Sequence, residues 1–230
     1  DTSAARDARF AYLGTNNVLG GRELGIAARG LLPDGGAYAT FVGLKGATNA
    51  KERIGGVAEG DGTGFVAKEN MGDNGRADTA RKNVRDALDR NPDLNLLVGI
   101  WSYNTPAIVD IVQQLGVRDK VKVVGFDADP PAIEGMADGL VDVMVVQNPY
   151  QMGYRGVKLL KAMVEEDQVV ISEILPHHGS ADGDLHSTGL KVVVPDGKSP
   201  LDGSMFDADT QFLTLSEFRA WLQKYGLSGS

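Results

Sequence analysis

Polar and aromatic side chains follow several short apolar runs of this sequence, each where a run ends. They are Asn49 and Arg53 after residues 37–42, Trp101, Tyr103 and Asn104 after 96–100, Asp127 after 121–126, and Gln147 at the end of 141–147. Carboxylates accept hydrogen bonds from hydroxyl groups, a guanidinium donates a fork of them, and amides do both. Flat aromatic faces suit the C–H side of a sugar ring. The set therefore fits a neutral polyol ligand.

Each of these side chains also has a plainer interpretation. Asp127 lies before Pro130 and is suited to cap the helix that follows. Trp101 taken alone fits a packing role, and Arg53 in a charged run fits a solvated helix face. Gln147 close to Pro149 fits a turn. The hypothesis of a binding site depends on all these residues following predicted strands. Ligands of open parallel sheets bind beyond the carboxyl ends of the strands.

The elements that would position these residues alternate along the chain. Apolar runs at 10–13, 37–42, 64–67, 96–100, 121–126 and 141–147 predict strands, and the segments between them have helical spacing. Thr105 and Pro106 are typical of a helix start and Gly116 of its end. Further helices are predicted from Asp73 or Asn74 to about residue 91, and over 149–165. This order predicts βαβ units and an α/β fold with a parallel sheet.

The last part of the chain has a different pattern. Residues 169–175 and 190–194 predict strands, separated by a polar loop, and 195–208 predicts a surface excursion because it is rich in Pro, Gly, Asp and Ser. Thr214 and Glu217 form a capping box, so we expect the chain to end on a docked amphipathic helix.

Composition excludes several classes of function. The 230 residues carry a formal net charge of −8 and contain no cysteine. The absence of cysteine excludes disulfide scaffolds and thiol chemistry, and the acidic balance disfavours nucleic acid and anionic lipid as partners. No stretch reaches the roughly 20 apolar residues that span a bilayer. A leader removed before Asp1 would leave the chain as it stands.

The sequence lacks the motifs of two common enzyme classes. Gly43 and Gly46 follow a strand but lack the G-x-G-x-x-G spacing of a dinucleotide-binding turn, and no G-x-S-x-G elbow of a hydrolase is present. The spacing of His177, His178 and His186 with Asp182 and Asp184 permits a metal, although such loops are more often solvated. The pattern predicts neither an enzyme, nor a cofactor, nor a metal site.

Residues 12–22, 46–53, 123–127 and 145–149 together resemble the type I periplasmic binding proteins of the ribose-binding class, in order and spacing. The resemblance covers residues 1 to about 195. It implies two Rossmann-like lobes joined by three crossings, with a sugar enclosed between them by hinge closure. The implied partners are a monosaccharide and the permease of an ABC importer, in the periplasm or another extracytoplasmic compartment.

The same resemblance assigns site residues one by one. Asp1 is similar to the family's acidic residue at the end of a strand, Arg53 to its clamping arginine, and Asp127 and Gln147 to its acidic and amide ligands. Tyr103 and Asn104 match a region that carries a polar ligand, with Trp101 as the stacking ring. Asn49 completes the set.

The resemblance also implies a further segment before Asp1, which would hold the first part of the N-terminal lobe. On this interpretation 1–15 and 148–176 are a remnant of that lobe, 16–147 and 177–195 are the C-terminal lobe, and 196–230 are a tail. An open sheet edge would then invite a second polypeptide or self-association. The alternative function is the effector-binding domain of a LacI-type sugar-responsive regulator, which shares the fold.

Overall fold

The structure, a computed structural model, describes residue 6 and residues 8–230, and the chain divides into two compact units. Unit 1 comprises residues 1–16 and 147–189, and unit 2 comprises 17–146 and 190–230. Asn16 and Gln147 fall in unit 1, which differs from the expected division, and two longer segments differ as well. Residues 177–189 belong to unit 1, because β7 (Leu185–Ser187) pairs with β1 (Tyr12–Gly14). The segment 196–230 belongs to unit 2, because one of its strands joins the large sheet.

Within the described residues, seven strands form the sheet of unit 2, in the order β3-β2-β4-β5-β6-β8-β9. Their bounds are β2 (Gly36–Val42), β3 (Phe65–Gly72), β4 (Leu94–Gly99), β5 (Lys122–Phe126), β6 (Val143–Val146), β8 (Leu190–Val194) and β9 (Thr210–Thr214). All neighbours are parallel except β6 and β8. The predicted α/β class with a parallel sheet is confirmed.

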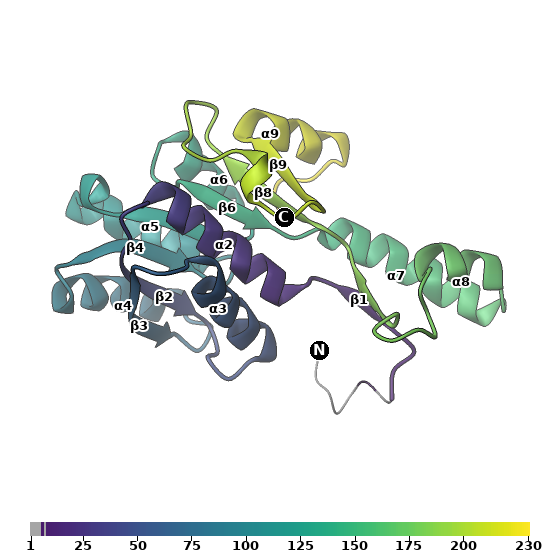
Figure 1. The fold of residues 1–230 in the computed structure, drawn as a ribbon. Coiled ribbons are helices and arrows are strands. Elements are labelled where there is room, and N and C mark those ends of the chain that lie inside the picture. The colour runs from purple at the N-terminus through teal and green to yellow at the C-terminus, as the bar shows by residue number, and fades with distance from the viewer. Residues whose placement is uncertain (1–5, 7) are drawn as a thin grey trace. The chain divides into compact units, whose positions relative to one another are not determined.

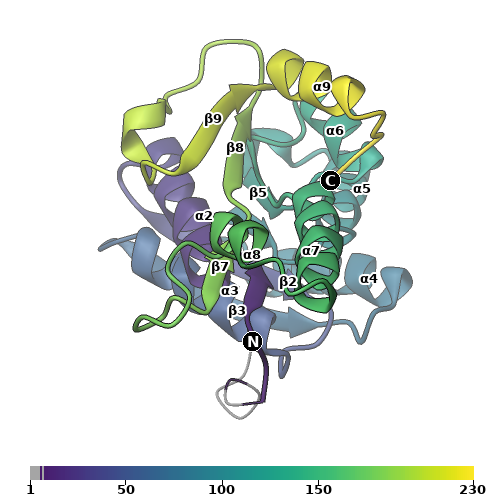
Figure 2. The ribbon, with the colours of Figure 1, turned by 90° about the vertical axis from the view of Figure 1, so that its right-hand side faces the viewer.

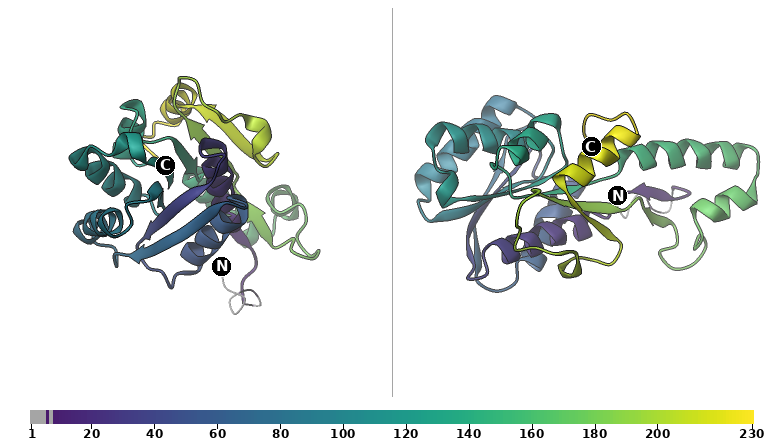
Figure 3. Two further views of the ribbon diagram at one scale, coloured as in Figure 1. Left: turned by 60° about the vertical axis from the view of Figure 1, so that its left-hand side comes forward. Right: turned by 90° about the horizontal axis from the view of Figure 1, so that it is seen from above.

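Helices cover both faces of this sheet (Figures 1 and 3). One face packs on α4 (Ala77–Arg90), α5 (Asn104–Leu115), α6 (Pro130–Ala137) and α9 (Leu215–Lys224), and the other on α2 (Asn17–Leu31) and α3 (Thr48–Gly60). Strands covered on both faces need apolar side chains on both, and β6 and β8 are buried at every position. Two apolar cores result, one on each side of the sheet.

Four glycines let α2 and α3 approach very closely. A Cβ atom at Gly21 would lie 2.0 Å from the carbonyl oxygen of Arg53, and one at Gly25 would lie 2.3 Å from that of Val57. Gly56 and Gly60 on α3 meet the backbone of α2 at 2.3 and 2.1 Å in the same way. Only glycine fits at such contacts. The backbone of α3 at Arg53 is therefore set by its contact with α2.

The C-terminal segment is built into unit 2, although it was predicted to be a surface excursion or tail. Figure 2 shows β9 beside β8, with α9 following it. Glu23 of α2 is fully buried, and its Oε1 accepts hydrogen bonds from Asp207 N (3.0 Å) and Thr210 Oγ1 (2.9 Å). Burial raises the pKa of Glu23. The capping box of Thr214 and Glu217 is confirmed at the start of α9.

Lys191 on β8 provides a test of this packing. Its side chain is buried, its ammonium lies 4.1 Å from the centre of the Trp221 ring, and burial lowers the pKa of Lys191 from 10.5 to about 8. A lysine whose folded pKa is depressed costs stability below that pKa, and the cost fades as pH rises toward the unfolded value. We expect the free energy of unfolding of the wild type to rise from about pH 8 to 10.5 relative to Lys191→Met. Urea unfolding across this range measures it, and a constant difference contradicts it.

Unit 1 contains α7 (Pro149–Val164), α8 (Gln168–Ile174) and a two-stranded parallel sheet of β1 and β7 in its described part. The two helices lie side by side (Figures 1 and 3). Leu159 and Ala162 of α7 pack against Ile171 and Ile174 of α8. No helix in the described residues has the length and apolar character to cross a membrane.

Three local predictions are wrong. The strand predicted over residues 169–175 is replaced by α8 (Gln168–Ile174), because the Asp167 side chain caps this helix by accepting from Val169 N and Val170 N, both at 3.1 Å. The helix expected from residue 73 or 74 begins at Ala77, because Asn74 and Gly75 adopt left-handed φ values of 57° and 76° in a turn. The helix expected to be capped by Thr105 already includes Asn104. Its end at Gly116, with φ 61°, is confirmed.

Candidate ligand-binding site

Arg53 is the central side chain of the candidate site in unit 2. It lies on α3, is 4% exposed, and its Nε donates to Asn17 Oδ1 at 3.0 Å. Its Nη1 donates to the carbonyl oxygen of Ile100 at 3.0 Å, and the guanidinium lies 3.7 Å from the centre of the Phe126 ring. The solvated alternative for Arg53 is therefore wrong. A guanidinium held at two nitrogens and one face is preorganised, which lowers the entropic cost of binding.

Asp127 follows β5 directly and lies close to Arg53. One carboxylate oxygen is 3.9 Å from Arg53 Nη1, and the residue has φ 69°, a conformation that is uncommon outside glycine. The alternative interpretation of Asp127 as a helix cap is wrong, because Asp129 occupies the N-cap position of α6. Strained residues of this kind cluster at functional sites, where the surrounding structure holds them.

Asn17 and Glu52 extend this cluster; both follow predicted strands in the sequence, but neither was among the predicted ligand residues. Asn17 is the first residue of α2, and its Nδ2 donates to Glu52 Oε2 at 3.1 Å while its Oδ1 accepts from Arg53. The position of Asn17 just after the first predicted strand was the available signal. Amide, carboxylate and guanidinium groups are thus joined in one polar group at the carboxyl ends of the strands, where hydroxyl groups of a ligand find both donors and acceptors.

Trp101, Tyr103 and Asn104, which were also predicted as ligand residues, follow β4. Arg53 reaches this loop through the carbonyl oxygen of Ile100, the residue before Trp101. Asn104 is completely buried, and its Oδ1 accepts from Trp101 N at 3.0 Å. Burial and a hydrogen bond to Asp73 raise the pKa of Tyr103, so the phenol stays protonated over the working range. Asp73 was missed as a site residue, because it was assigned to the start of a helix.

The remaining predicted site residues lie elsewhere. Asn49 is half-buried in the first turn of α3, one turn before Arg53. Gln147 belongs to unit 1, where its Oε1 accepts from Thr15 Oγ1 at 2.6 Å. The prediction for Asp1 falls outside the described residues. The structure thus brings Arg53 and Asp127 together within unit 2, and Arg53 bonds the backbone of Ile100, which precedes the loop of residues 101–104.

The polar loop of unit 1 is occupied by internal contacts. The Phe10 and His178 rings stack at 4.2 Å, and Arg155 lies 2.7 Å from His186 Nε2. Burial and Arg155 lower the pKa of His186. Hydrogen bonds from Arg6 and Arg9 lower the pKa of Asp184 to about 2. Among the described residues, no group of His, Asp and Glu side chains is arranged to hold a metal ion.

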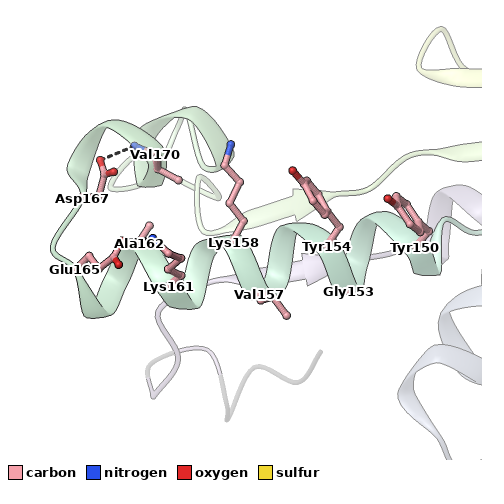
Figure 4. A pocket seen from close by; sticks show the side chains of 10 residues that line it. All are labelled: Tyr150, Gly153, Tyr154, Val157, Lys158, Lys161, Ala162, Glu165, Asp167 and Val170. Atoms are coloured by element: carbon pink, nitrogen blue, oxygen red, sulfur yellow. Dashed lines mark hydrogen bonds and ion pairs between the residues drawn. The ribbon is translucent and has the colours of Figure 1, made fainter. Parts of the chain in front are cut away.

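A third feature is an exposed apolar surface on α7, which we call the α7 face and define by Tyr150, Tyr154, Val157, Leu160 and Val164. Val157, Leu160 and Val164 are 69%, 64% and 85% exposed. The rings of Tyr150 and Tyr154 are stacked, with centres 6.2 Å apart, and point to the same side of the helix (Figure 4). Lys158, Lys161 and Glu165 border a hollow along this helix. Contiguous exposed apolar side chains of this kind mark interaction surfaces.

A mostly parallel sheet covered by helices, with polar groups beyond its carboxyl ends, is typical of doubly wound α/β proteins that bind small ligands. Residues 1–168 match the family described as periplasmic binding protein domain, and the chain belongs to this family. The family resemblance read from the sequence is confirmed.

Named relatives are sugar-binding proteins. The chain is 25% identical over 176 residues to the ribose import binding protein RbsB of Salmonella typhimurium, covering 74% of this chain and 57% of that protein. It is 20% identical over 150 residues to the xylose/arabinose-binding protein XylF of Sulfolobus acidocaldarius, a match that covers 63% of this chain and 37% of that protein. An ABC transporter solute-binding protein from Burkholderia graminis, in complex with D-arabinose, superposes with a TM-score of 0.74 at 25% identity, covering 85% and 65%. The chain spans about half the length of RbsB.

Proposed function

We propose that this chain forms part of a monosaccharide-binding site in a solute-binding protein of an ABC importer. The expected ligands are ribose, xylose or galactose-like sugars. The observation that carries this proposal is the buried Arg53, held by Asn17 and Ile100, next to the strained Asp127. Buried charges that are paired and preorganised offer strong hydrogen bonds to hydroxyl groups at low entropic cost.

The function is binding without chemical conversion of the ligand. In this proposal the sugar is enclosed by closure of the two lobes, and the permease recognises the closed form. Units 1 and 2 would contribute to the N-terminal and C-terminal lobes respectively. Asp1 and Gln147 of unit 1 and Asn49 of unit 2 would join the other predicted ligand residues. The protein would act in the periplasm or another extracytoplasmic space, with the permease and no nucleic acid as partners.

Calorimetric titration of the protein with D-ribose, D-xylose, D-arabinose and D-galactose tests the proposal. We expect saturable binding of at least one sugar, lost when Asp127 is replaced by alanine. Asp138→Ala is the control, because Asp138 is an exposed residue at the C-terminal end of α6, the opposite end of that helix from Asp127. Absence of heat with every sugar would contradict the proposed function, and so would undiminished binding by Asp127→Ala.

We propose further that the α7 face is covered by a second polypeptide, which in a preparation of the isolated 230-residue chain is another copy of it. The exposed apolar side chains of the α7 face and the two-stranded sheet of β1 and β7 support this. Parallel sheets are normally covered on both faces and have more strands, so added polypeptide would complete an N-terminal lobe.

The isolated chain is therefore expected to self-associate at micromolar concentration through the α7 face. Val157→Asp together with Leu160→Glu should shift it toward a monomer, because charges in an apolar interface lose hydration without gaining partners. Light scattering after size-exclusion chromatography measures the mass. Leu44→Asp, at a 50% exposed residue of unit 2, is the control. A wild-type chain that is monomeric at all concentrations would contradict this association.

A further inference from the structure

Asp73 is a buried carboxylate that the sequence pattern did not assign to the site. It is 1% exposed, and its Oδ1 accepts from Tyr103 Oη at 2.5 Å and from Gly75 N at 2.8 Å. Its Oδ2 accepts from Asn104 Nδ2 at 2.9 Å. No lysine, arginine or histidine forms an ion pair with it in the part of the chain that the structure describes. Three neutral donors therefore satisfy this charge, and two of them are predicted ligand residues.

These hydrogen bonds fix which groups remain for a ligand. A tyrosine hydroxyl has one proton, and Tyr103 donates it to Asp73, so its oxygen can only accept from any further partner. Asn104 is oriented in the same way, because its Nδ2 donates to Asp73 while its Oδ1 accepts from Trp101 N. Asp73 thus determines the direction of hydrogen bonding in this loop.

Gly43, just after β2, lies directly against the side chains of Trp101 and Tyr103. A Cβ atom at Gly43 would lie 2.0 Å from Cζ3 of Trp101 and 2.7 Å from Oη of Tyr103, so both rings rest on its backbone. The backbone of Asp73 is tied to the same place, because its N–H lies 3.2 Å from the carbonyl oxygen of Gly43. The Tyr103 side chain is therefore held between Gly43 and the Asp73 carboxylate, and the Trp101 ring lies against Gly43 beside it.

Resting on the proposed function, we propose that Asp73 is a positioning residue that makes the Tyr103 hydroxyl an acceptor and so selects a ligand with a hydroxyl donor at that point. The ligand class is a monosaccharide with a free hydroxyl there, in preference to its deoxy, fluoro or O-methyl analogues. A site arranged for a hydroxyl rejects an analogue without one, since a buried polar group would be left unpaired.

A ligand-free measurement tests the positioning role. The chain has two tryptophans, so in a Trp221→Phe background the emission reports Trp101 alone. We expect Asp73→Ala to shift this emission to longer wavelength and to raise its quenching by acrylamide, because Tyr103 and the loop lose their anchor. Asp78→Asn is the control, because the Asp78 side chain is 94% exposed on the next helix. An emission unchanged by Asp73→Ala in a folded protein overturns the proposal.

A binding measurement tests the selectivity. The sugar that binds in calorimetry is compared with its monodeoxy and monofluoro analogues, one position at a time. At one position the wild type should bind both analogues at least about 100-fold more weakly, and Tyr103→Phe should lose that preference. In Asp73→Asn the new amide can donate to Tyr103 and free its proton, so the fluoro analogue should gain relative to the deoxy analogue.

The outcomes separate this inference from the proposed function. An identical analogue profile in the wild type, Tyr103→Phe and Asp73→Asn, with binding intact, overturns the selectivity role and leaves sugar binding standing. Failure of every sugar to bind the wild type contradicts the proposed function and with it the selectivity. The Trp101 emission then still decides whether Asp73 positions the loop.

Discussion

Replacement of Arg53 by alanine is expected to weaken monosaccharide binding by about 2–5 kcal/mol, the range for removing one member of a buried, hydrogen-bonded charged pair. The variant would remove the donors to Asn17 and Ile100 and the cation that lies over Phe126. It would also leave the Asp127 carboxylate without its nearby charge. Calorimetry with the sugar bound by the wild type measures the loss.

Two further variants show whether the effect belongs to the site. Arg53→Lys retains the charge but not the planar fork, so we expect it to recover only a small part of the affinity. Arg22→Ala removes an exposed arginine of α2 that pairs with the exposed Glu59, and it should leave binding unchanged. Equal affinities of Arg53→Ala and the wild type would exclude Arg53 from the site.

Adjacent glycines of α3 are expected to respond in opposite directions to the same substitution. Gly56→Ala places a Cβ atom 2.3 Å from the carbonyl oxygen of Val18, so α2 and α3 must separate. Overpacking of this kind lowers the free energy of unfolding by about 1–3 kcal/mol. At Gly56 the added Cβ atom meets the backbone of α2, which cannot move aside as a side chain could. Gly55→Ala points into open space and should add roughly 0.5–1 kcal/mol through helix propensity.

Urea unfolding of the two variants gives the comparison directly. Because both variants replace glycine by alanine on the same helix, the effect of alanine on the unfolded chain is the same in both and cancels in the difference between their stabilities. Separation of the helices would also displace the backbone of Arg53, which meets Gly21, so Gly56→Ala should bind sugar more weakly than Gly55→Ala. Equal stabilities would contradict the close contact between the helices.

Much of unit 2 could be predicted because local sequence signals agree with the fold there. Strands covered on both faces read as continuous apolar runs, and the end of α5 at Gly116 follows from a left-handed residue. The strand-end position of Arg53 and Asp127 is likewise visible in the sequence. The structure places them together because the strands are parallel and neighbouring helices follow them.

Other features depend on contacts that no local pattern contains. The strands β7 and β9 are both short. β7 pairs with β1, which lies far away in the sequence, and β9 pairs with β8 across the loop between them. The β-branched residues 169–171 of α8 favour a strand by propensity. The Asp167 cap and the packing of α8 on α7 stabilise a helix instead. Asp73 joins the site only through side chains 30 residues further along the chain. Pairings of this kind require the tertiary structure.

The glycine contacts between α2 and α3 also constrain how this protein can diverge. Every replacement of glycine adds a side chain, so at Gly21, Gly25, Gly56 and Gly60 nearly all mutations are expected to be selected against. The backbone position of Arg53 is therefore expected to stay the same as the sequence diverges. Under the proposed function, new ligand preferences are then expected to arise in the turn of residues 73–75 and the loop of residues 101–104, where side chains can change without moving the helix that carries Arg53.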